Sequence, residues 1–125
     1  MSLDLTLLPD RLAVCRLHAG TALPAWAVSG GLSSVSWTTE ETSIVCSETA
    51  VPPDVQSDAG WRAFMVASPL DFSLTGILLS IAQPLTEAGV GIFALSTYDT
   101  DYVLVKESSL QVAVDALAEF GHRVM

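Results

Sequence analysis

Strand-like and helix-like hydrophobic patterns follow one another in the second half of the chain. Residues 61–68 alternate with a period of two, which predicts a strand. A helix should follow, with Ser73 as its N-cap and a left-handed Gly89 at its end. Pro84 lacks a backbone N–H and should weaken the helical hydrogen bonds near Ser80. The apolar stripe of this helix has the spacing of one helical face: Leu74, Ile77, Leu78, Ile81 and Leu85.

A hairpin is expected after the helix. Residues 90–95 form a nearly continuous apolar run, which is typical of a central strand. Residues 102–106 form the next strand, and the polar residues 96–101 between them favour a turn. The two strands should therefore pair antiparallel.

The sequence predicts a second helix and a short strand at the end of the chain. Ser108 and Ser109 open the helix, Gln111 completes a capping box, and Gly121 ends the helix. Residues 122–125 form the strand. The order β-α-β-β-α-β is the ferredoxin-like unit, so the expected class is α+β with antiparallel sheets. The predicted inner face of the helix is Leu110, Val114, Leu117 and Phe120.

The first half follows a related plan with shorter elements. Its predicted strands cover residues 12–17, 32–37 and 42–46, with 3–8 as a candidate strand before them. The other predicted segments are a short helix at 24–28, at most one helical turn at 51–55, and a polar connector at 56–60.

An internal repeat relates the two halves. A shift of 60 residues matches strand 43–45 with strand 103–105 and brings acidic residues together near the start of each. Strand, turn and acid coincide, which favours a duplication. We therefore expect two tandem units, a degenerate one over residues 1–60 and a complete one over residues 61–125. The matched pairs are Pro24 with Pro84, Gly31 with Gly91, Ser36 with Ser96, and Glu41 with Asp101.

Composition narrows the classes of function. Half of the 125 residues are apolar, which allows burial to offset the ordering entropy of folding. Five Lys and Arg stand against fourteen Asp and Glu, a net charge of -9 that argues against nucleic acid or anionic membranes as partners. No apolar run approaches the roughly 18 residues of a membrane span, and no basic segment starts the chain, so we expect a cytoplasmic protein.

Cysteine and histidine give little sign of chemistry. Cys15 and Cys46 lie in apolar strand-like runs, which favours two buried free thiols; a disulfide or a two-cysteine metal site is the alternative. His18 and His122 lie near element ends, where we expect them at the surface, and their spacing does not match a zinc site. No nucleophile-elbow or phosphate-loop motif is present. We expect no catalytic residue, metal or cofactor.

Two polar segments remain as a candidate site. Residues 70–77 bring hydroxyls and a glycine to a helix start, whose N–H groups attract a carboxylate. Residues 96–101 carry Asp99 and Asp101, and Asp101 would suit an ammonium group. Together they suggest a site for a zwitterion. Plain helix capping and a solvated turn remain alternatives for the two segments.

These segments also carry a resemblance to a known family. The blocks SLTGI, PLTEAGVGIFALSTYDTDYVLV and WTTEETSIV resemble the ACT domain, a ferredoxin-like module that binds amino acids and regulates metabolic enzymes. The resemblance is greater to stand-alone tandem-ACT proteins of bacteria, which are related to the CASTOR-type arginine sensors of animals. It implies that two C-terminal units pair side by side in a homodimer and that an amino acid lies at the seam.

Carried over to this sequence, the resemblance implies a set of ligand-binding residues. Leu79 departs from the pattern, because the arginine sensors resemble one another in carrying an acid there. This departure argues against arginine and favours a ligand with a neutral or aromatic side chain. The implied contacts are Thr75, Gly76 and Ile77 in the loop, Leu79 one turn later, Gly91 and Ile92 across the seam, and Thr97, Tyr98, Thr100 and Asp101 in the hairpin.

The function that these observations favour is amino-acid sensing by a small regulatory, allosteric protein at a homodimer interface, with a regulated enzyme as a further partner. One alternative is an ACT interaction module that binds no ligand and assembles with a partner enzyme or transporter. A third class, an enzyme using Asp99 and Asp101 as an acid–base pair, has no accompanying catalytic residue.

Overall fold

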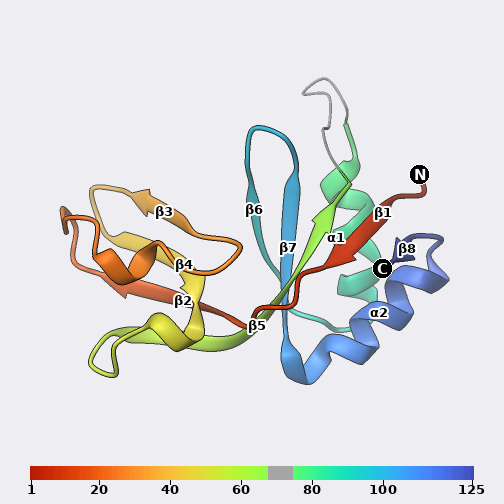
Figure 1. Ribbon diagram of the computed structural model, residues 1–125. Coiled ribbons are helices and arrows are strands. Elements are labelled where there is room, and N and C mark those ends of the chain that lie inside the picture. Colours follow the sequence, from red (N-terminus) through yellow and green to blue (C-terminus); the bar gives the residue numbers. More distant parts are fainter. Residues whose placement is uncertain (68–74) are drawn as a thin grey trace. The chain divides into compact units, whose positions relative to one another are not determined.

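The computed structural model describes residues 1–67 and 75–125, and the chain divides into two compact units (Figure 1). The C-terminal unit combines Met1–Pro9 with Arg62–Met125, and the N-terminal unit is Asp10–Trp61. The sequence predicted units of residues 1–60 and 61–125. In the structure, the first nine residues belong to the C-terminal unit instead.

The fold is α+β, as predicted. The strands are β1 (Asp4–Leu7), β2 (Leu12–Leu17), β3 (Ser34–Trp37), β4 (Thr42–Ser47), β5 (Gln56–Val66), β6 (Phe93–Ser96), β7 (Asp101–Lys106) and β8 (Arg123–Val124). The helices are α1 (Ile77–Glu87) and α2 (Leu110–Glu119), with short 3₁₀ turns η1 (Ala25–Ala27), η2 (Glu48–Ala50) and η3 (Glu107–Ser109).

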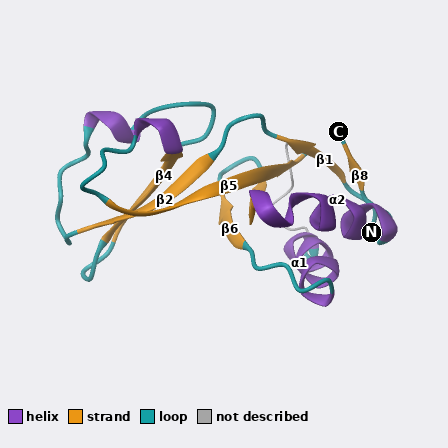
Figure 2. Ribbon diagram, turned by 90° about the horizontal axis from the view of Figure 1, so that it is seen from below, coloured by secondary structure: helices purple, strands orange, loops and turns teal. Residues whose placement is uncertain are grey.

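The C-terminal unit places its first strand inside its sheet. β1 pairs antiparallel with β5 and parallel with β8, and β7 pairs with both β5 and β6. Both α-helices lie beside each other along these strands (Figure 2). The apolar core between helices and strands includes Leu5, Phe64, Val66, Ile81, Leu85, Val103, Val105 and Leu117.

Helix α1 begins later than its sequence pattern predicts. Its N-cap is Gly76, at a left-handed φ of 79°, and not Ser73, which lies outside the described residues. Glycine adopts this conformation without the steric cost that a side chain would add. At the other end Gly89 has the predicted left-handed φ, 76°, and its N–H donates to the Thr86 carbonyl.

Helix α2 begins after Ser109 and ends before Gly121, at a left-handed φ of 109°, as predicted, but its capping box and its inner face differ from prediction. Its N-cap, Ser109, makes no side-chain capping bond, and Gln111 donates to Asp115 instead of completing a capping box. Phe120 is 41% exposed and not part of the inner face. The helix buries Ala113 and Leu117 most deeply, so the C-cap position of Phe120 falls outside the buried stripe, and its ring packs near that of His122.

The predicted central strand at 90–95 is shorter and lies elsewhere in the sheet. β6 begins at Phe93 and pairs with β7, and within the described residues no other strand pairs with it. Its side chains alternate between half-buried and exposed positions, as on a strand with one solvated face. The apolar character of the run arises because Val90 and Ile92, ahead of the strand, pack into the core.

His122 is buried, contrary to the prediction of a surface position. Its side chain is 4% exposed and connects three segments of the C-terminal unit. Nδ1 accepts a hydrogen bond from the Leu3 backbone N–H at 3.1 Å, and Nε2 lies 2.7 Å from the Ser80 carbonyl. These contacts require a neutral ring with its proton on Nε2. Ser80 is the residue whose carbonyl Pro84 cannot bond, so the histidine supplies the missing donor.

The N-terminal unit orders its strands β3-β4-β2-β5. The hairpin β3–β4 has the predicted antiparallel pairing, with Trp37 opposite Thr42. Cys15 and Cys46 are buried free thiols, as predicted, on neighbouring strands of one small core. The predicted helix at 24–28 is the 3₁₀ turn η1. Residues 51–55 contain a single turn, as predicted, in which the Val55 N–H donates to the Pro52 carbonyl at 3.2 Å.

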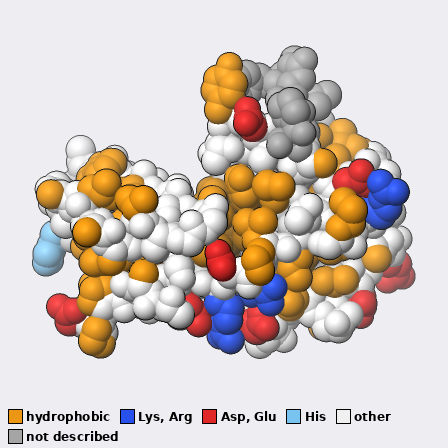
Figure 3. All heavy atoms as spheres, viewed as in Figure 1, with side chains coloured by type: hydrophobic (Ala, Val, Ile, Leu, Met, Phe, Trp, Pro, Cys, Tyr) orange, Lys and Arg blue, Asp and Glu red, His pale blue; other side chains and the backbone are white. Residues whose placement is uncertain are grey.

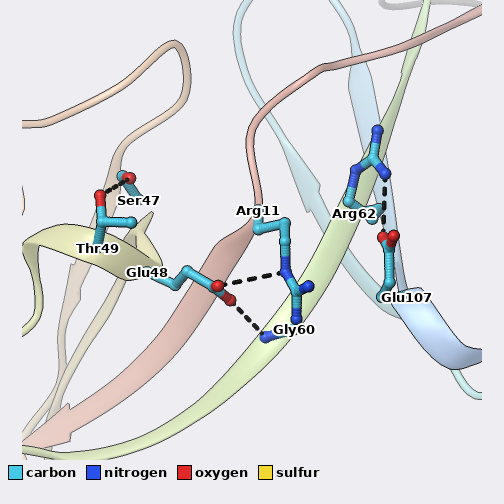
Figure 4. Close-up of polar contacts among 7 residues, drawn as sticks. All are labelled: Arg11, Ser47, Glu48, Thr49, Gly60, Arg62 and Glu107. Atoms are coloured by element: carbon cyan, nitrogen blue, oxygen red, sulfur yellow. Dashed lines mark hydrogen bonds and ion pairs between the residues drawn. The ribbon is translucent and has the colours of Figure 1, made fainter.

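Residues 56–60 are not a connector but the first half of β5. They pair with β2 through a bulge, at which the register shifts between Leu12 and Val14. Gly60 occupies the bulge at a φ of 81°, and its N–H donates to Glu48 at 2.9 Å (Figure 4). The Glu48 carboxylate also pairs with Arg11 at 3.2 Å. The polar residues lie on exposed positions, which hides a strand from hydrophobic periodicity.

The two hairpins correspond to one another with a shift of 59 residues, not the 60 of the expected repeat. In the first hairpin the Thr38 N–H donates to the Glu41 carbonyl, and in the second the Thr97 N–H donates to the Thr100 carbonyl. The structural counterpart of Asp101 is therefore Thr42, not Glu41.

Candidate functional site

The N-cap residue of α1 has no side chain that could cap the first backbone N–H groups of the helix. It is Gly76, and the first turn of the helix contains no acidic residue. Gly76 is exposed, and a Cβ added to it would meet no atom within 4 Å. Ile77 is buried in the core, so only its backbone N–H can reach a ligand. This helix start therefore favours an anion.

The hairpin turn is held to the end of β5. Thr100 is 4% exposed, and its hydroxyl donates to the Val66 carbonyl at 2.7 Å. β5 leads toward residues 68–74, so this bond brings the turn close to the strand end that precedes them. The turn and the start of α1 lie at the same end of the C-terminal unit (Figure 1). The sequence suggested that these two segments form one site, but it could not show how close they are in space.

Within the turn, the predicted residues have different surroundings. Thr97 uses both its N–H and its hydroxyl on the Thr100 carbonyl, which fixes the turn. Tyr98 is 80% exposed. Thr100 is thus a structural anchor through its hydroxyl proton, and that oxygen can serve a ligand only as an acceptor.

Asp101 is half-buried and oriented by a serine that the sequence did not single out for the site. The Ser96 hydroxyl donates to Asp101 Oδ1 at 2.6 Å, and Ser96 lies directly opposite Asp101 in the hairpin. The length of the turn sets this register, so the pairing could have been read from the hairpin pattern. With Oδ1 occupied, Oδ2 is the oxygen left for a cationic group.

A single chain does not bring all predicted residues together. Gly91 and Ile92 follow the far end of α1, about 16 Å along an 11-residue helix from Gly76. Gly91 is exposed, and Ile92 packs against the core. Leu79 is 65% exposed on the first turn of α1. Contact of one ligand with both groups would need a second copy of the chain.

Three hollows that described residues line contain none of the predicted site residues. One of about 370 Å³ lies in the C-terminal unit near the ends of α1 and α2, lined by Pro84, Glu87, Ala88, Ala116, Glu119 and Phe120. Two others, of about 390 and 200 Å³, lie in the N-terminal unit.

Other features of the described residues bear on partners. No three or more His, Cys, Asp or Glu side chains in these ranges gather as a metal site would require. Neither helix reaches the length and apolarity that crossing a membrane demands. On the face in Figure 3, basic side chains form only small, separate patches.

Sequence comparison relates both parts of the chain to known families. The ACT domain matches residues 56–119, and a family of N-terminal domains matches residues 10–54. A cytosolic arginine sensor for mTORC1, subunit 1, from Bos taurus is 37% identical over 67 residues, which are 50% of this chain and 20% of that protein. The human protein of the same name is 35% identical over 68 residues. The chain thus spans about a fifth of the length of these relatives.

Structure comparison extends the similarity to whole chains. A crystal structure of a protein from Agobacterium tumefaciens is 41% identical, covers 100% of this chain and 93% of its own, and has a TM-score of 0.94. The regulatory subunit of aspartate kinase from Thermus thermophilus is 12% identical, covers 92% and 95%, and has a TM-score of 0.58, a likeness of fold alone. On the family match and the bacterial relative, this chain belongs to the ACT-domain family.

Proposed function

We propose that this protein is a small regulatory sensor that binds a free amino acid at an interface between two copies of the chain. The observation that carries the proposal is the glycine-capped start of α1 at the same end of the unit as the half-buried residue Asp101. An α-amino acid has a carboxylate for the helix start and an ammonium group for Asp101.

The polar groups of the site suit a zwitterion without any basic side chain. Backbone N–H groups at a helix start bind a carboxylate through hydrogen bonds and the helix dipole. Asp101 is held by Ser96 in one orientation, so binding an ammonium group to Oδ2 costs little side-chain entropy.

A homodimer supplies the contacts that one chain lacks. β6 pairs with β7 and, in the described part of the chain, with no other strand, so its outer edge is available for pairing. A two-fold contact along this edge would give each ligand Gly91 and Ile92 from the other copy, in an isologous interface. The exposed Leu79 would face the ligand side chain and favour a neutral or aromatic one over arginine.

The relatives support the regulatory part of the proposal. One is a cytosolic arginine sensor and another is the regulatory subunit of aspartate kinase. We extend this to an allosteric, non-enzymatic protein in the cytoplasm, with a metabolic enzyme as the regulated partner.

Calorimetric titration of the full chain with the twenty amino acids tests the proposal. At least one neutral or aromatic amino acid should bind more tightly than millimolar. Asp101→Ala should weaken that binding at least about tenfold, a loss of about 1.4 kcal/mol that is modest for a charge-assisted contact. The matched control is Asp99→Ala, which removes an exposed acid two residues away in the same turn and should bind as the wild type does.

Two outcomes would contradict the proposal. One is no binding tighter than millimolar by any amino acid to a protein that sedimentation has shown to be a dimer. The other is unchanged affinity in Asp101→Ala. The first of these would favour an interaction module that assembles with a partner enzyme or transporter, for which the apolar residues around Gly91 would serve as a contact.

A further inference from the structure

A hollow in the N-terminal unit combines charges of both signs with an apolar wall. Its volume is about 390 Å³, at the small end of the roughly 300–1,000 Å³ of ligand pockets, which suits a metabolite of few atoms. We call it the Arg16 pocket. It lies where β2 ends and β5 begins, and its lining residues are Arg16, Leu17, His18, Thr21, Asp54, Val55 and Gln56.

Arg16 is the basic group of this pocket, and Glu41 and Asp58 line a smaller hollow beside it without forming an ion pair with it among the described residues. Arg11, Arg62 and Arg123 each form an ion pair, with Glu48, Glu107 and Asp4. Arg16 forms no such pair with the described residues, and its Nη2 donates to the backbone carbonyl of Glu40 at 3.2 Å. That bond orients the guanidinium and leaves donors that match a carboxylate.

Asp54 gives the pocket an opposite charge. Its carboxylate is exposed and accepts no hydrogen bond from the described residues, so its oxygens remain available. In a chain of net charge -9, a simple anion meets long-range repulsion on approach. A zwitterion meets none and satisfies Arg16 and Asp54 together.

The rest of the pocket is held in place by the fold. Leu17 and Val55 pack against the small core of the unit and form an apolar wall. Thr21 is fixed at both its N–H and hydroxyl, which donate to the His18 carbonyl, while its own carbonyl accepts from Trp37. A fixed wall lowers the entropy cost of binding.

We propose that the Arg16 pocket is a second ligand site, which takes a small zwitterion with an aliphatic side chain, its carboxylate on Arg16 and its ammonium group near Asp54. This site lies wholly within the N-terminal unit and needs neither the start of α1 nor a second copy of the chain. The proposal for this site can therefore be tested independently of the proposal for the site at Asp101.

Three probes separate the contributions of the two charges. They are L-leucine, its 2-oxo analogue 4-methyl-2-oxopentanoate, which lacks the ammonium group, and 3-methylbutylamine, which lacks the carboxylate. Each is titrated into the full ¹⁵N-labelled chain carrying Asp101→Ala, which removes the other proposed site. Amide signals of Leu17, Thr21 and Val55 should shift saturably with leucine, and each analogue should bind at least about tenfold more weakly.

Variants then assign the charges. Arg16→Gln should weaken the binding of leucine at least about tenfold. Arg11→Gln, the same change outside the pocket, should leave the affinity for leucine unchanged. Asp54→Asn should weaken the binding of leucine and leave the binding of the 2-oxo acid unchanged. A loss of structure would weaken both. This comparison also decides the question should Arg16→Gln fail to fold.

Four results would overturn the assignment, and three of them concern leucine. They are no saturable shift of these amides at 10 mM leucine, shifts confined to residues 75–101, and equal binding of leucine by Arg16→Gln and the unsubstituted pocket. Equal binding of all three probes would also overturn it, since the pocket would then recognise only the shared alkyl group.

Discussion

Replacing His122 with alanine should destabilise the C-terminal unit through two hydrogen bonds. The change removes the acceptor of the Leu3 N–H and the donor to the Ser80 carbonyl. A buried polar group left without a partner costs about 1–3 kcal/mol, and both groups here are only partly buried. The total loss, including the cavity, should be about 2–4 kcal/mol in the free energy of unfolding.

A double-mutant cycle with Pro84 tests the reason for this loss. Pro84→Ala restores a backbone N–H four residues after Ser80, so the Ser80 carbonyl gains a helical partner. In that background His122→Ala should cost about 1 kcal/mol less than in the wild type.

Urea unfolding followed by circular dichroism at 222 nm measures these effects, because both α-helices belong to the C-terminal unit. The matched control is His18→Ala, at the other, exposed histidine, which should change stability by less than about 0.5 kcal/mol. A loss in His122→Ala no larger than that of the control would refute the stabilising role. Full additivity with Pro84→Ala would refute the link to the proline.

Two further predictions concern the N-terminal unit. Burial, with Cys46 nearby, raises the pKa of the Cys15 thiol from its ordinary value of 9.0 to about 11, so the unfolded chain ionises first as pH rises. The stability advantage of wild type over Cys15→Ala should shrink by about 2–3 kcal/mol between pH 8 and pH 11 in urea titrations; an unchanged difference would contradict this. Glu48→Ala should lower the free energy of unfolding by about 1–3 kcal/mol, because it removes the acceptor of the Gly60 N–H. Tryptophan fluorescence measures this loss, since all three tryptophans lie in this unit. Glu48→Gln keeps an acceptor oxygen and should lose less than half as much; equal losses would assign the effect to the charge and not to the bulge.

The sequence predicted those elements whose signals are local. The hairpin β6–β7 follows from a polar turn between apolar runs. The stripe along α1 is confirmed at Ile77, Ile81 and Leu85, whereas Leu78 is 40% exposed and Leu74 lies outside the described residues. The first half of β5 was missed because its side chains are exposed and a glycine bulge interrupts the alternation. Local patterns carry no information about what covers a strand.

The candidate site was grouped by residue type, and the structure adds the contacts that types do not reveal. Two of these contacts depend on pairings between distant segments. They are the bond from Thr100 to the Val66 carbonyl and the contact of the buried His122 with Ser80 of α1. No periodicity encodes such pairings. Ser96 is the exception, since the hairpin register places it opposite Asp101.

The position of β1 between β5 and β8 has a consequence for how the molecule acquires its structure. β1 pairs with β8 through Asp4 and Arg123, which are 119 residues apart, so the pairing of β1 within the sheet of the C-terminal unit can be completed only after β8 has been made. Contacts of such sequence separation slow folding, because a long loop must close before they form. The strands of the N-terminal unit all precede β8 in the chain, so they can pair before β1 has its second neighbour. A fragment beginning at residue 61 would lack a strand from the interior of its sheet, and a peptide of the first nine residues is the natural segment to restore it.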